Sequence, residues 1–239
     1  MTHAILLAGG FGTRLRPLTQ TVPKPMLPIA GLPVTEHQLA MARRAGISSV
    51  VLATSYLAEV FIPYFGDGST WGMKLQYAVE EEPLGTGGAI RNAAQLLNGN
   101  ESIVIFNGDV LSSHNLSRQI QLHESLNADV TMHLTHVADA RAFGCVPIDG
   151  EARVMAFLET MEKPVANTIN AGCSVFNPWI LDQIPAVKAV SVKKEIFTDL
   201  VQRAESIYGR GDDSDGIVLG HPAALLRASM QLVRGISKP

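Results

Sequence analysis

This chain has little of what several common site types require. Its 239 residues include two cysteines, Cys145 and Cys173, which lie in apolar stretches without metal-site spacing. Neither a Gly-x-Ser-x-Gly turn nor a His-Glu-x-x-His helix occurs, which argues against a hydrolase nucleophile and a zinc-protease centre. We therefore expect both cysteines to be buried and unpaired, in a reducing compartment.

Long apolar runs and blocks of basic charge are also missing. The formal net charge is −3 and the basic residues are scattered, so no basic field favours nucleic acid. No apolar run approaches the ~20 residues that span a bilayer, and Met-Thr-His at the start lacks the basic region of a secretory signal. We expect a cytoplasmic protein without nucleic-acid or membrane partners. The oligomeric state stays open, a homo-oligomer included.

The chain does have a regular alternation of strand-like and helix-like segments. Short apolar runs predict strands at Ala4–Ala8, Ser49–Thr54, Lys74–Val79, Ser102–Phe106, Val130–Thr135 and Ile169–Phe176. Helical spacing predicts helices at Val34–Ala45, Gly88–Leu97, Leu116–Leu126, Ser191–Ala204 and Pro222–Val233. Strands separated by helices of this length predict an α/β fold, with a Rossmann-like, mostly parallel sheet flanked by helices.

Between Gly144 and Phe176 the pattern changes, because short strand-like segments follow one another without a long helix. This predicts a small antiparallel, lid-like subregion at about 144–176. Long linkers, low-complexity tracts and repeats are absent from the sequence. We therefore expect residues 1–239 to form a single domain.

A glycine-rich segment after the first strand is the most informative part of the chain. Gly9, Gly10 and Gly12 leave the backbone amides bare, so that an anion can approach them closely. Arg14 and Lys24 follow, and they supply a bidentate fork and a compact point charge for phosphate. The segment predicts a polyphosphate-binding loop.

Two other phosphate loops fit this segment poorly. A Walker A loop ends in Gly-Lys-Ser/Thr, whereas Gly12 is followed by Thr13 and Arg14. A dinucleotide-binding fingerprint needs a third glycine at position 15, which is leucine. A nicotinamide-dependent enzyme is therefore disfavoured.

Further polar residues follow later strands. Asp109 comes directly after the strand ending at Phe106, at the edge where parallel sheets bind ligands. It is either a Mg²⁺ ligand or an ordinary turn residue. The acidic string Glu80–Glu82 before Gly87 and Gly88 is either a base-binding edge or a solvated turn. Gly144 and Asn170-Ala171-Gly172 suit sugar hydroxyls, or are plain strand and turn residues.

Taken together, these motifs resemble the signature of the sugar-1-phosphate nucleotidyltransferases. The resemblance rests on Leu-Leu-Ala-Gly-Gly-Phe-Gly-Thr-Arg-Leu-Arg-Pro-Leu-Thr at 6–19 with Pro-Lys-Pro at 23–25, and on Glu-Pro-Leu-Gly-Thr-Gly-Gly at 82–88, Asn-Gly-Asp-Val at 107–110 and Ile-Asn-Ala-Gly at 169–172. It covers most of residues 4–200. Within the family, the residues of these motifs are most similar to those of the mannose-1-phosphate guanylyltransferases, or GDP-mannose pyrophosphorylases. The C-terminal β-helix of many members has no counterpart within the 239 residues.

The resemblance implies a GT-A-like fold and a reaction that needs Mg²⁺. A sugar 1-phosphate, here mannose 1-phosphate or a similar one, attacks the α-phosphorus of a nucleoside triphosphate, expected to be GTP, and pyrophosphate leaves. The implied catalytic residues are Arg14, Lys24 and the metal ligand Asp109. The implied nucleotide-binding residues are Leu7, Ala8, Gly9, Gly10, Gly12, Thr13, Arg14, Lys24, Glu82, Gly87 and Gly88. The implied sugar-binding residues are Gly144, Glu159, Asn170 and Gly172.

The chain departs from the family pattern at two positions. Members have a phosphate-gripping lysine directly after the glutamate that matches Glu159, where this chain has Thr160; Lys163 comes three residues later. Members also have a second metal-binding aspartate where this chain has Val218, although Asp212, Asp213 and Asp215 lie upstream. Two hypotheses follow: a nucleotidyltransferase with rearranged contacts to substrate phosphate and metal, or a non-catalytic homologue that binds a nucleotide or nucleotide sugar in a regulatory or scaffolding role.

Overall fold

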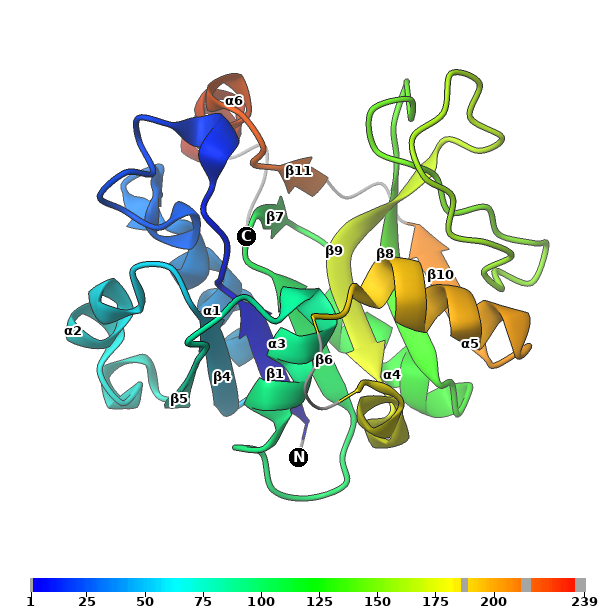
Figure 1. Cartoon of the computed structure of the whole chain (residues 1–239), viewed down its shortest axis with the longest axis horizontal. Helices are drawn as coiled ribbons and strands as arrows, with labels where there is room; N and C mark the ends of the chain where they lie inside the picture. The colour runs from blue at the N-terminus through cyan, green and yellow to red at the C-terminus, as the bar shows by residue number, and fades with distance from the viewer. Residues whose placement is uncertain (1, 186–188, 212–215, 235–239) are drawn as a thin grey trace.

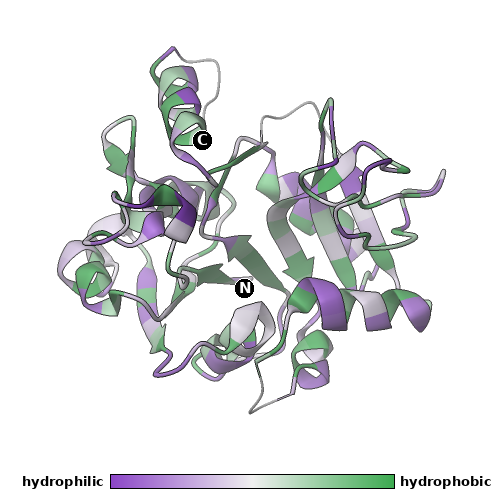
Figure 2. Cartoon of the chain, turned by 45° about the horizontal axis from the view of Figure 1, so that its top comes forward, coloured by the Kyte–Doolittle hydropathy of each residue, from purple (hydrophilic) through white to green (hydrophobic). Residues whose placement is uncertain are grey.

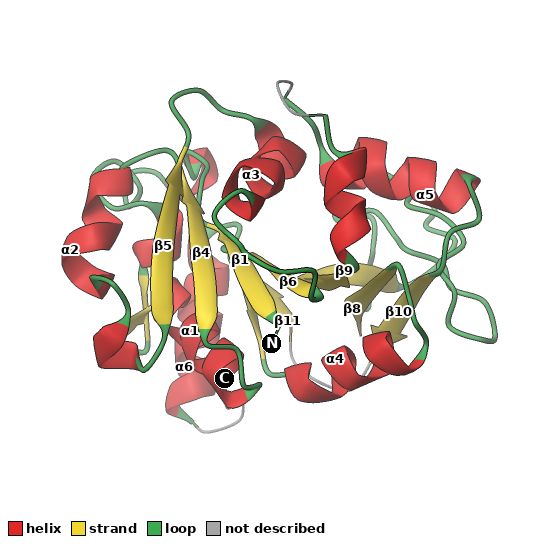
Figure 3. Ribbon diagram, turned by 90° about the horizontal axis from the view of Figure 1, so that it is seen from below, coloured by secondary structure: helices red, strands yellow, loops and turns green. Residues whose placement is uncertain are grey.

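A computed structural model of the chain describes residues 2–185, 189–211 and 216–234. Its centre is a seven-stranded sheet (Figure 3), with the order β10 (Ile207–Gly211), β8 (Val130–His136), β9 (Thr168–Phe176), β6 (Ile103–Asn107), β1 (His3–Leu7), β4 (Ser49–Thr54) and β5 (Lys74–Val79). Neighbouring strands are parallel except that β9 runs antiparallel to both β6 and β8. The predicted mostly parallel sheet is confirmed.

Helices cover both faces of this sheet (Figure 3). One face carries α3 (Gly85–Ala94), the π-helical turn η6 (Val192–Phe197) and α5 (Thr198–Gln202). The other carries α1 (Val34–Arg44), α2 (Phe61–Phe65) and α4 (Leu116–Ser125). Short 3-10 turns complete the connections: η1 (Thr13–Leu15), η2 (Lys24–Met26), η3 (Ala58–Val60), η4 (Ser69–Trp71) and η5 (Pro178–Gln183).

The central strands are apolar on both sides because each side packs against helices. In β1, Ile5 enters the core beneath α3, whereas its neighbour Leu6 enters the core beneath α1, and both are fully buried. Burying one such side chain contributes about 1.5–3 kcal/mol. Figure 2 shows hydrophobic residues along the strands at the centre of the sheet. Both cysteines are free and buried, as expected, and burial raises the pKa of the Cys173 thiol.

Most helices lie where the sequence predicts them. The helix at α1 ends one residue early, and Gly46 follows it with φ of +82°, the left-handed geometry that glycine adopts readily. The helix expected at Gly88–Leu97 begins at Gly85 instead. The helix expected at Ser191–Ala204 is divided into η6 and α5.

The segment expected to hold short antiparallel strands has a different local structure. Residues 137–167 connect β8 to β9 and contain no strand, only single bridges that pair Ile148 with Val154 and Arg153 with Tyr208. The antiparallel strand of this part of the chain is β9, which is an interior strand of the main sheet. The prediction of several short strands before it is therefore wrong.

The C-terminal part of the chain returns to the N-terminal part. Strand β11 (Gly216–Val218) pairs antiparallel with β7 (Val110–Ser112), and α6 (Pro222–Val233) follows. A small core joins Leu219 and Ala224 to Leu15 and to Ile29 of the two-stranded sheet β2 (Pro28–Ile29) and β3 (Leu32–Pro33). Figure 1 shows β7, β11 and α6 together above the sheet, next to the N-terminal segment in dark blue.

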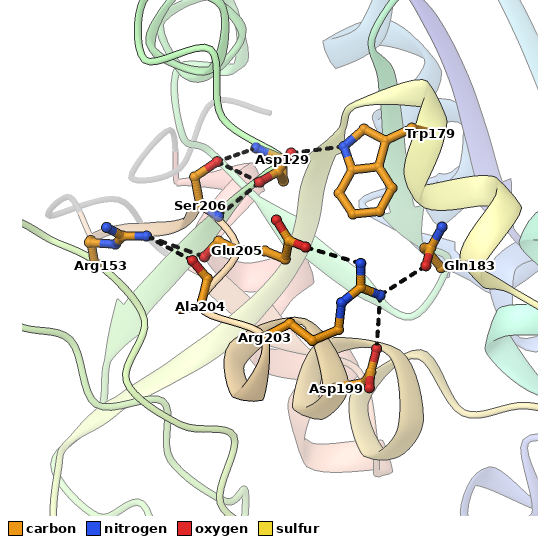
Figure 4. Close-up of polar contacts among 9 residues, drawn as sticks. All are labelled: Asp129, Arg153, Trp179, Gln183, Asp199, Arg203, Ala204, Glu205 and Ser206. Carbon is orange, nitrogen blue, oxygen red and sulfur yellow. Dashed lines mark hydrogen bonds and ion pairs between the residues drawn. The ribbon is translucent and has the colours of Figure 1, made fainter.

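A network of hydrogen bonds surrounds Asp129, directly before the start of β8 (Figure 4). The Asp129 carboxylate accepts hydrogen bonds from Ser206 N at 2.8 Å, Ser206 Oγ at 2.7 Å and Trp179 Nε1 at 2.8 Å. Nearby, Arg203 donates to Gln183 Oε1 and Glu205 Oε1. Burial by itself raises the pKa of Asp129, but the hydrogen bonds from Ser206 and Trp179 outweigh it, so this pKa lies below its ordinary value.

We predict that Asp129→Asn lowers the free energy of unfolding by about 1–3 kcal/mol at pH 7, because half-buried donors on Ser206 and Trp179 lose a charged acceptor. Because the pKa of Asp129 is lower in the folded chain than its ordinary value of 3.8, the ionised carboxylate stabilises the fold above pH 3.8. This stabilisation is lost as the pH falls through the pKa that Asp129 has in the folded chain. Urea unfolding at pH 7 and pH 3 measures this, and the deficit should shrink at pH 3. The exposed Glu124→Gln on α4 is the control, and equal stability of Asp129→Asn and the unmodified chain at pH 7 would contradict the prediction.

Candidate functional site

Three cavities open at the edge of the sheet where β1, β6 and β8 end. The glycine-rich loop follows β1, Asp109 follows β6, and residues 137–167 follow β8. Figure 1 shows these segments above the same edge of the sheet. Leu7 and Thr86 line all three cavities, so the cavities are parts of one cleft.

The first cavity holds the cations predicted from the sequence. It measures about 380 Å³, and its walls are Leu7, Gly9, Gly10, Gly12, Thr13, Arg14, Leu15, Lys24, Pro25, Thr86, Asn107, Gly108, Asp109 and Gly220. The structure thus brings the three loop glycines, Thr13, Arg14, Lys24 and Asp109 together around one space. Ala8 is fully buried and does not line it.

The glycine-rich loop is held in one conformation by its neighbours. Gly12 has φ of +56°, and a Cβ atom there would stand 2.8 Å from Thr19 Cγ2. Thr19 Oγ1 donates to Gly12 O at 2.8 Å, and the Tyr56 hydroxyl donates to Thr19 O at 3.2 Å. A larger residue at position 12 would break this packing, which keeps the loop open toward the cavity.

Arg14 joins the loop to the C-terminal segment. It lies on η1 and is exposed. A Cβ atom on Gly220 would lie 3.5 Å from Arg14 Nη1, an ordinary contact distance, so the guanidinium lies next to Gly220. The segment after β11 therefore forms one wall of the cation cavity.

Lys24 and Asp109 form the polar centre of the cleft. Lys24 Nζ donates to Asp109 Oδ2 at 2.7 Å, and the lysine side chain is only 12% exposed. Pro23 precedes η2 and Pro25 lies within it, which restricts the backbone on both sides of Lys24. The pair spans 85 residues of sequence and joins the N-terminal loop to the end of β6.

Contacts with the end of β1 and with α1 hold the backbone around Asp109 in place. Gly108 N donates to Leu7 O at 2.9 Å, an approach that a side chain at position 108 would block. Gln38 of α1 donates from Nε2 to Asn107 O at 2.8 Å and to Val110 O at 2.9 Å. These buried contacts orient the turn so that Asp109 reaches the cleft.

The second cavity collects the residues predicted to lie near a sugar. It measures about 280 Å³, and its polar walls are Thr86, Asn107, Asp109, Asn170, Ser174 and Lys193, with Gly144, Gly172 and Val218 beside them. Asn170 Oδ1 accepts from Gly172 N at 2.8 Å. Glu159 does not line this cavity, but its Oε1 lies 3.6 Å from Lys193 Nζ at the margin.

The third cavity is mostly apolar and measures about 230 Å³. Its walls are Leu7, Gly9, Gly10, Phe11, Ser55, Glu80, Pro83, Gly85, Thr86 and Ala89. Glu80 is half-buried, and burial raises the pKa of its carboxyl group even though Leu84 N donates to it at 3.1 Å. Figure 3 shows α3, which carries Gly85, beside the ends of β4 and β1.

The structure does not bring Glu82, Gly87 and Gly88 to any of these three cavities. Glu82 is exposed, and the two glycines are buried inside α3. Gly87 packs against Val190, whose carbonyl accepts from Gly87 N at 2.7 Å. Gly85 and Thr86, two residues earlier, line the third cavity instead, and α3 begins three residues before the predicted start.

Of the two departures from the family pattern, only the one at Val218 lies at the second cavity. Val218 lines it and pairs with Val110, next to Asp109, so an apolar side chain occupies the position of the second carboxylate. Thr160 and Lys163 are exposed and do not line it. Asp212, Asp213 and Asp215 lie outside the described residues. Within residues 2–185, 189–211 and 216–234, no three His, Cys, Asp or Glu side chains are grouped to hold a metal ion.

The sequence did not single out several of the lining residues, among them Thr86, Asn107 and Lys193, and it named Glu80 only as part of the string Glu80–Glu82. Thr86 lies in the motif at 82–88 and Asn107 in the motif at 107–110. Their positions next to Gly85 and near Asp109 could therefore have identified them as candidate site residues. Lys193 had no such signal, since its approach to Gly144 depends on how η6 packs against the 137–167 segment.

Comparison with known proteins agrees with this geometry. The family model described as nucleotidyl transferase matches residues 3–234. The chain belongs to this nucleotidyltransferase family. It is 50% identical to mannose-1-phosphate guanylyltransferase of Mycobacterium tuberculosis over 98% of the chain and 65% of that protein. It is 36% identical to the catalytic subunit beta of the Drosophila melanogaster mannose-1-phosphate guanylyltransferase over 85% of the chain and 56% of that protein.

Two solved structures share the fold. HddC from Yersinia pseudotuberculosis, complexed with GMP-PN, superposes with a TM-score of 0.81 at 26% identity over 97% of this chain and 100% of that chain. A UDP-glucose pyrophosphorylase complexed with UDP-glucose gives 0.84 at 18% identity, over 98% of this chain and 99% of that chain, which speaks for the fold alone.

The chain spans just under two thirds of the length of the first of these sequence relatives and a little over half of the second. Within the described parts of the chain, no helix combines the length and apolar character that crossing a bilayer would need.

Proposed function

We propose that the chain transfers guanosine monophosphate from GTP to a sugar 1-phosphate of the mannose 1-phosphate type, with release of pyrophosphate. The observation that carries this proposal is that Asp109 lines both the cation cavity and the second, polar cavity. A carboxylate at that junction stands where two anionic reactants would have to meet.

The cation cavity suits the triphosphate. A nucleoside triphosphate carries about four negative charges, of which one Mg²⁺ offsets two. Arg14 and Lys24 add two positive charges beside bare glycine amides. These groups attract the negatively charged phosphate oxygens, and the attraction is strongest where water is excluded from the cavity.

The apolar third cavity suits the base. Its walls of Leu7, Pro83 and Ala89 would pack against a flat ring, and Gly85 leaves its backbone accessible. Glu80 can accept hydrogen bonds from the adjacent N–H and amino groups of guanine, a pair of donors that adenine does not present. This edge and the guanylyltransferase names of the two sequence relatives favour GTP.

The second cavity suits the acceptor. The Asn170 oxygen is engaged by Gly172 N, which leaves the amide NH₂ as the group it can donate to a sugar hydroxyl. A phosphate oxygen of the acceptor would attack the α-phosphorus, and the bond from that phosphorus to the β-phosphate bridging oxygen would break. The chain's own contribution is to align the two anions and neutralise the charge between them.

Asp109 is the residue that would hold Mg²⁺. One or two carboxylates together with substrate phosphates are the usual protein ligands of this ion, and Asp109 supplies one carboxylate at the edge of the triphosphate cavity. The bound ion would neutralise charge on the phosphates. With Val218 in place of a second carboxylate, the protein contributes fewer oxygen ligands than the family pattern provides.

The proposed reaction is tested by measuring pyrophosphate release from GTP with mannose 1-phosphate and Mg²⁺, with ATP, UTP, CTP and dTTP as competitors. We predict that Arg14→Ala lowers kcat/KM at least about 100-fold, because a phosphate-binding cation worth roughly 3 kcal/mol is lost. The thermal midpoint should change little, since Arg14 is exposed.

Arg118→Ala is the matched control, because Arg118 is an exposed arginine on α4 that lines none of the three cavities. Near-normal turnover in Arg14→Ala would contradict the role of the loop. GTP binding by the unmodified chain without turnover on a panel of sugar 1-phosphates would favour the non-catalytic homologue, a reading that the apolar Val218 position supports.

A second prediction concerns the metal. Val218→Asp adds a carboxylate beside Asp109, and we expect it to lower the Mg²⁺ concentration for half-maximal turnover about tenfold, since a further oxygen ligand contributes roughly 1–2 kcal/mol. Val218→Asn, similar in shape but uncharged, should have a smaller effect. Mg²⁺ titrations at saturating GTP measure both. The same half-maximal concentration in all three chains would contradict a metal site at Asp109.

A further inference from the structure

The acceptor side of the cleft lacks the lysine that the family pattern places after Glu159, yet it does not lack a cation. Thr160 occupies the family position and is exposed. Lys163, the nearest lysine along the chain, is also exposed and does not line the second cavity. Among the residues that line this cavity, Lys193 is the one positively charged side chain.

We propose that Lys193 binds the phosphate group of the acceptor, and that η6 thereby supplies the charge that the segment after Glu159 has lost. This inference rests on the proposed function, because it names the residue that would hold the second anionic substrate of that reaction.

The contact with Gly144 and the position of its own helical turn support this assignment. A Cβ atom on Gly144 would lie 2.9 Å from Lys193 Nζ, so the absence of a side chain at 144 leaves the space that the ammonium group uses. Gly144 has φ of +71°, a conformation that also favours glycine. Val192 and Phe197 of the same π-helical turn line the cavity and carry Lys193 toward it.

The backbone that carries Lys193 is well anchored. Val192 N donates to Thr86 Oγ1 at 3.0 Å, and Thr86 lines both the cation cavity and the second cavity. Thr198 Oγ1 donates to Lys193 O at 3.2 Å. The lysine is therefore held at a fixed place relative to the residues where the two substrates would meet.

The ion pair with Glu159 does not explain the position of Lys193 as a stabilising contact. Lys193 Nζ and Glu159 Oε1 are 3.6 Å apart, and the two side chains are 33% and 58% exposed. Ion pairs this exposed contribute little to stability, because solvent screens them. The pair can instead hold the ammonium group at the cavity margin until a phosphate, with its greater charge, takes it over.

The test compares Lys193→Met with Lys194→Met. Lys194 is the exposed neighbour in the same turn and does not line the cavity, so its loss removes the same charge from the same helix. With mannose 1-phosphate as the varied substrate at saturating GTP, Lys193→Met should raise KM about 10- to 100-fold, the range for a lost charge-assisted hydrogen bond. KM for GTP should change less than about twofold, and Lys194→Met should leave both constants unchanged.

A binding measurement separates this inference from the proposed function. Calorimetric titration with mannose 1-phosphate and with mannose measures how far the unmodified chain prefers the phosphorylated sugar. Lys193→Met should lose most of that preference, and Lys193→Arg, which keeps the charge, should retain more of it. This readout holds even if the unmodified chain shows no turnover, an outcome that would count against the proposed function alone.

Two results would overturn the role of Lys193. One is an unchanged KM and an unchanged preference for the phosphorylated sugar in Lys193→Met. The other is an equal loss of affinity for GTP and for mannose 1-phosphate, which would mean that the lysine supports the cleft as a whole.

Discussion

The ion pair between Lys24 Nζ and Asp109 Oδ2, at 2.7 Å, is the contact on which the cleft depends. It joins the N-terminal loop to the end of β6, and the first two cavities meet at its aspartate. The pair is held on one side by the prolines around Lys24 and on the other by Gln38 beneath the 107–110 turn. Under the proposed function, this lysine, which is 12% exposed, would exchange the carboxylate for phosphate, and Asp109 would exchange the lysine for Mg²⁺.

The rest of the fold can be understood as support for this junction. Parallel strands bring the loop after β1 and the turn after β6 to one edge, and β9, though antiparallel, begins at that same edge, with Asn170 near its start. The C-terminal segment closes the third side, since β11 pairs with β7 and Gly220 lies beside Arg14 in the wall of the first cavity. Residues more than 200 positions apart therefore share one cavity wall.

Much of this follows from the sequence. The apolar runs predict six of the seven central strands, because strands buried on both faces need such runs. The loop motif predicts the cation cavity, because bare backbone amides at three glycines followed by Arg14 and Lys24 are suited to binding an anion. Short elements escaped prediction: β7 and β11 are three residues each, and their pairing depends on a long-range return of the chain. The same reason applies to Lys193, which reaches the cleft only through the packing of η6. The predicted start of α3 was three residues too late, and the sequence therefore pointed to Gly87 and Gly88, which are buried in the helix, rather than to Gly85, which lines the third cavity.

The central claim is that one continuous cleft binds triphosphate and acceptor on either side of Asp109. A crystal structure with Mg²⁺ and a non-hydrolysable GTP analogue tests it most directly. The account predicts the ion on Asp109, the phosphates on Arg14 and Lys24, and the base beside Glu80 and Gly85. A nucleotide bound elsewhere, or bound with the Lys24–Asp109 pair intact and no ion on the aspartate, would contradict it.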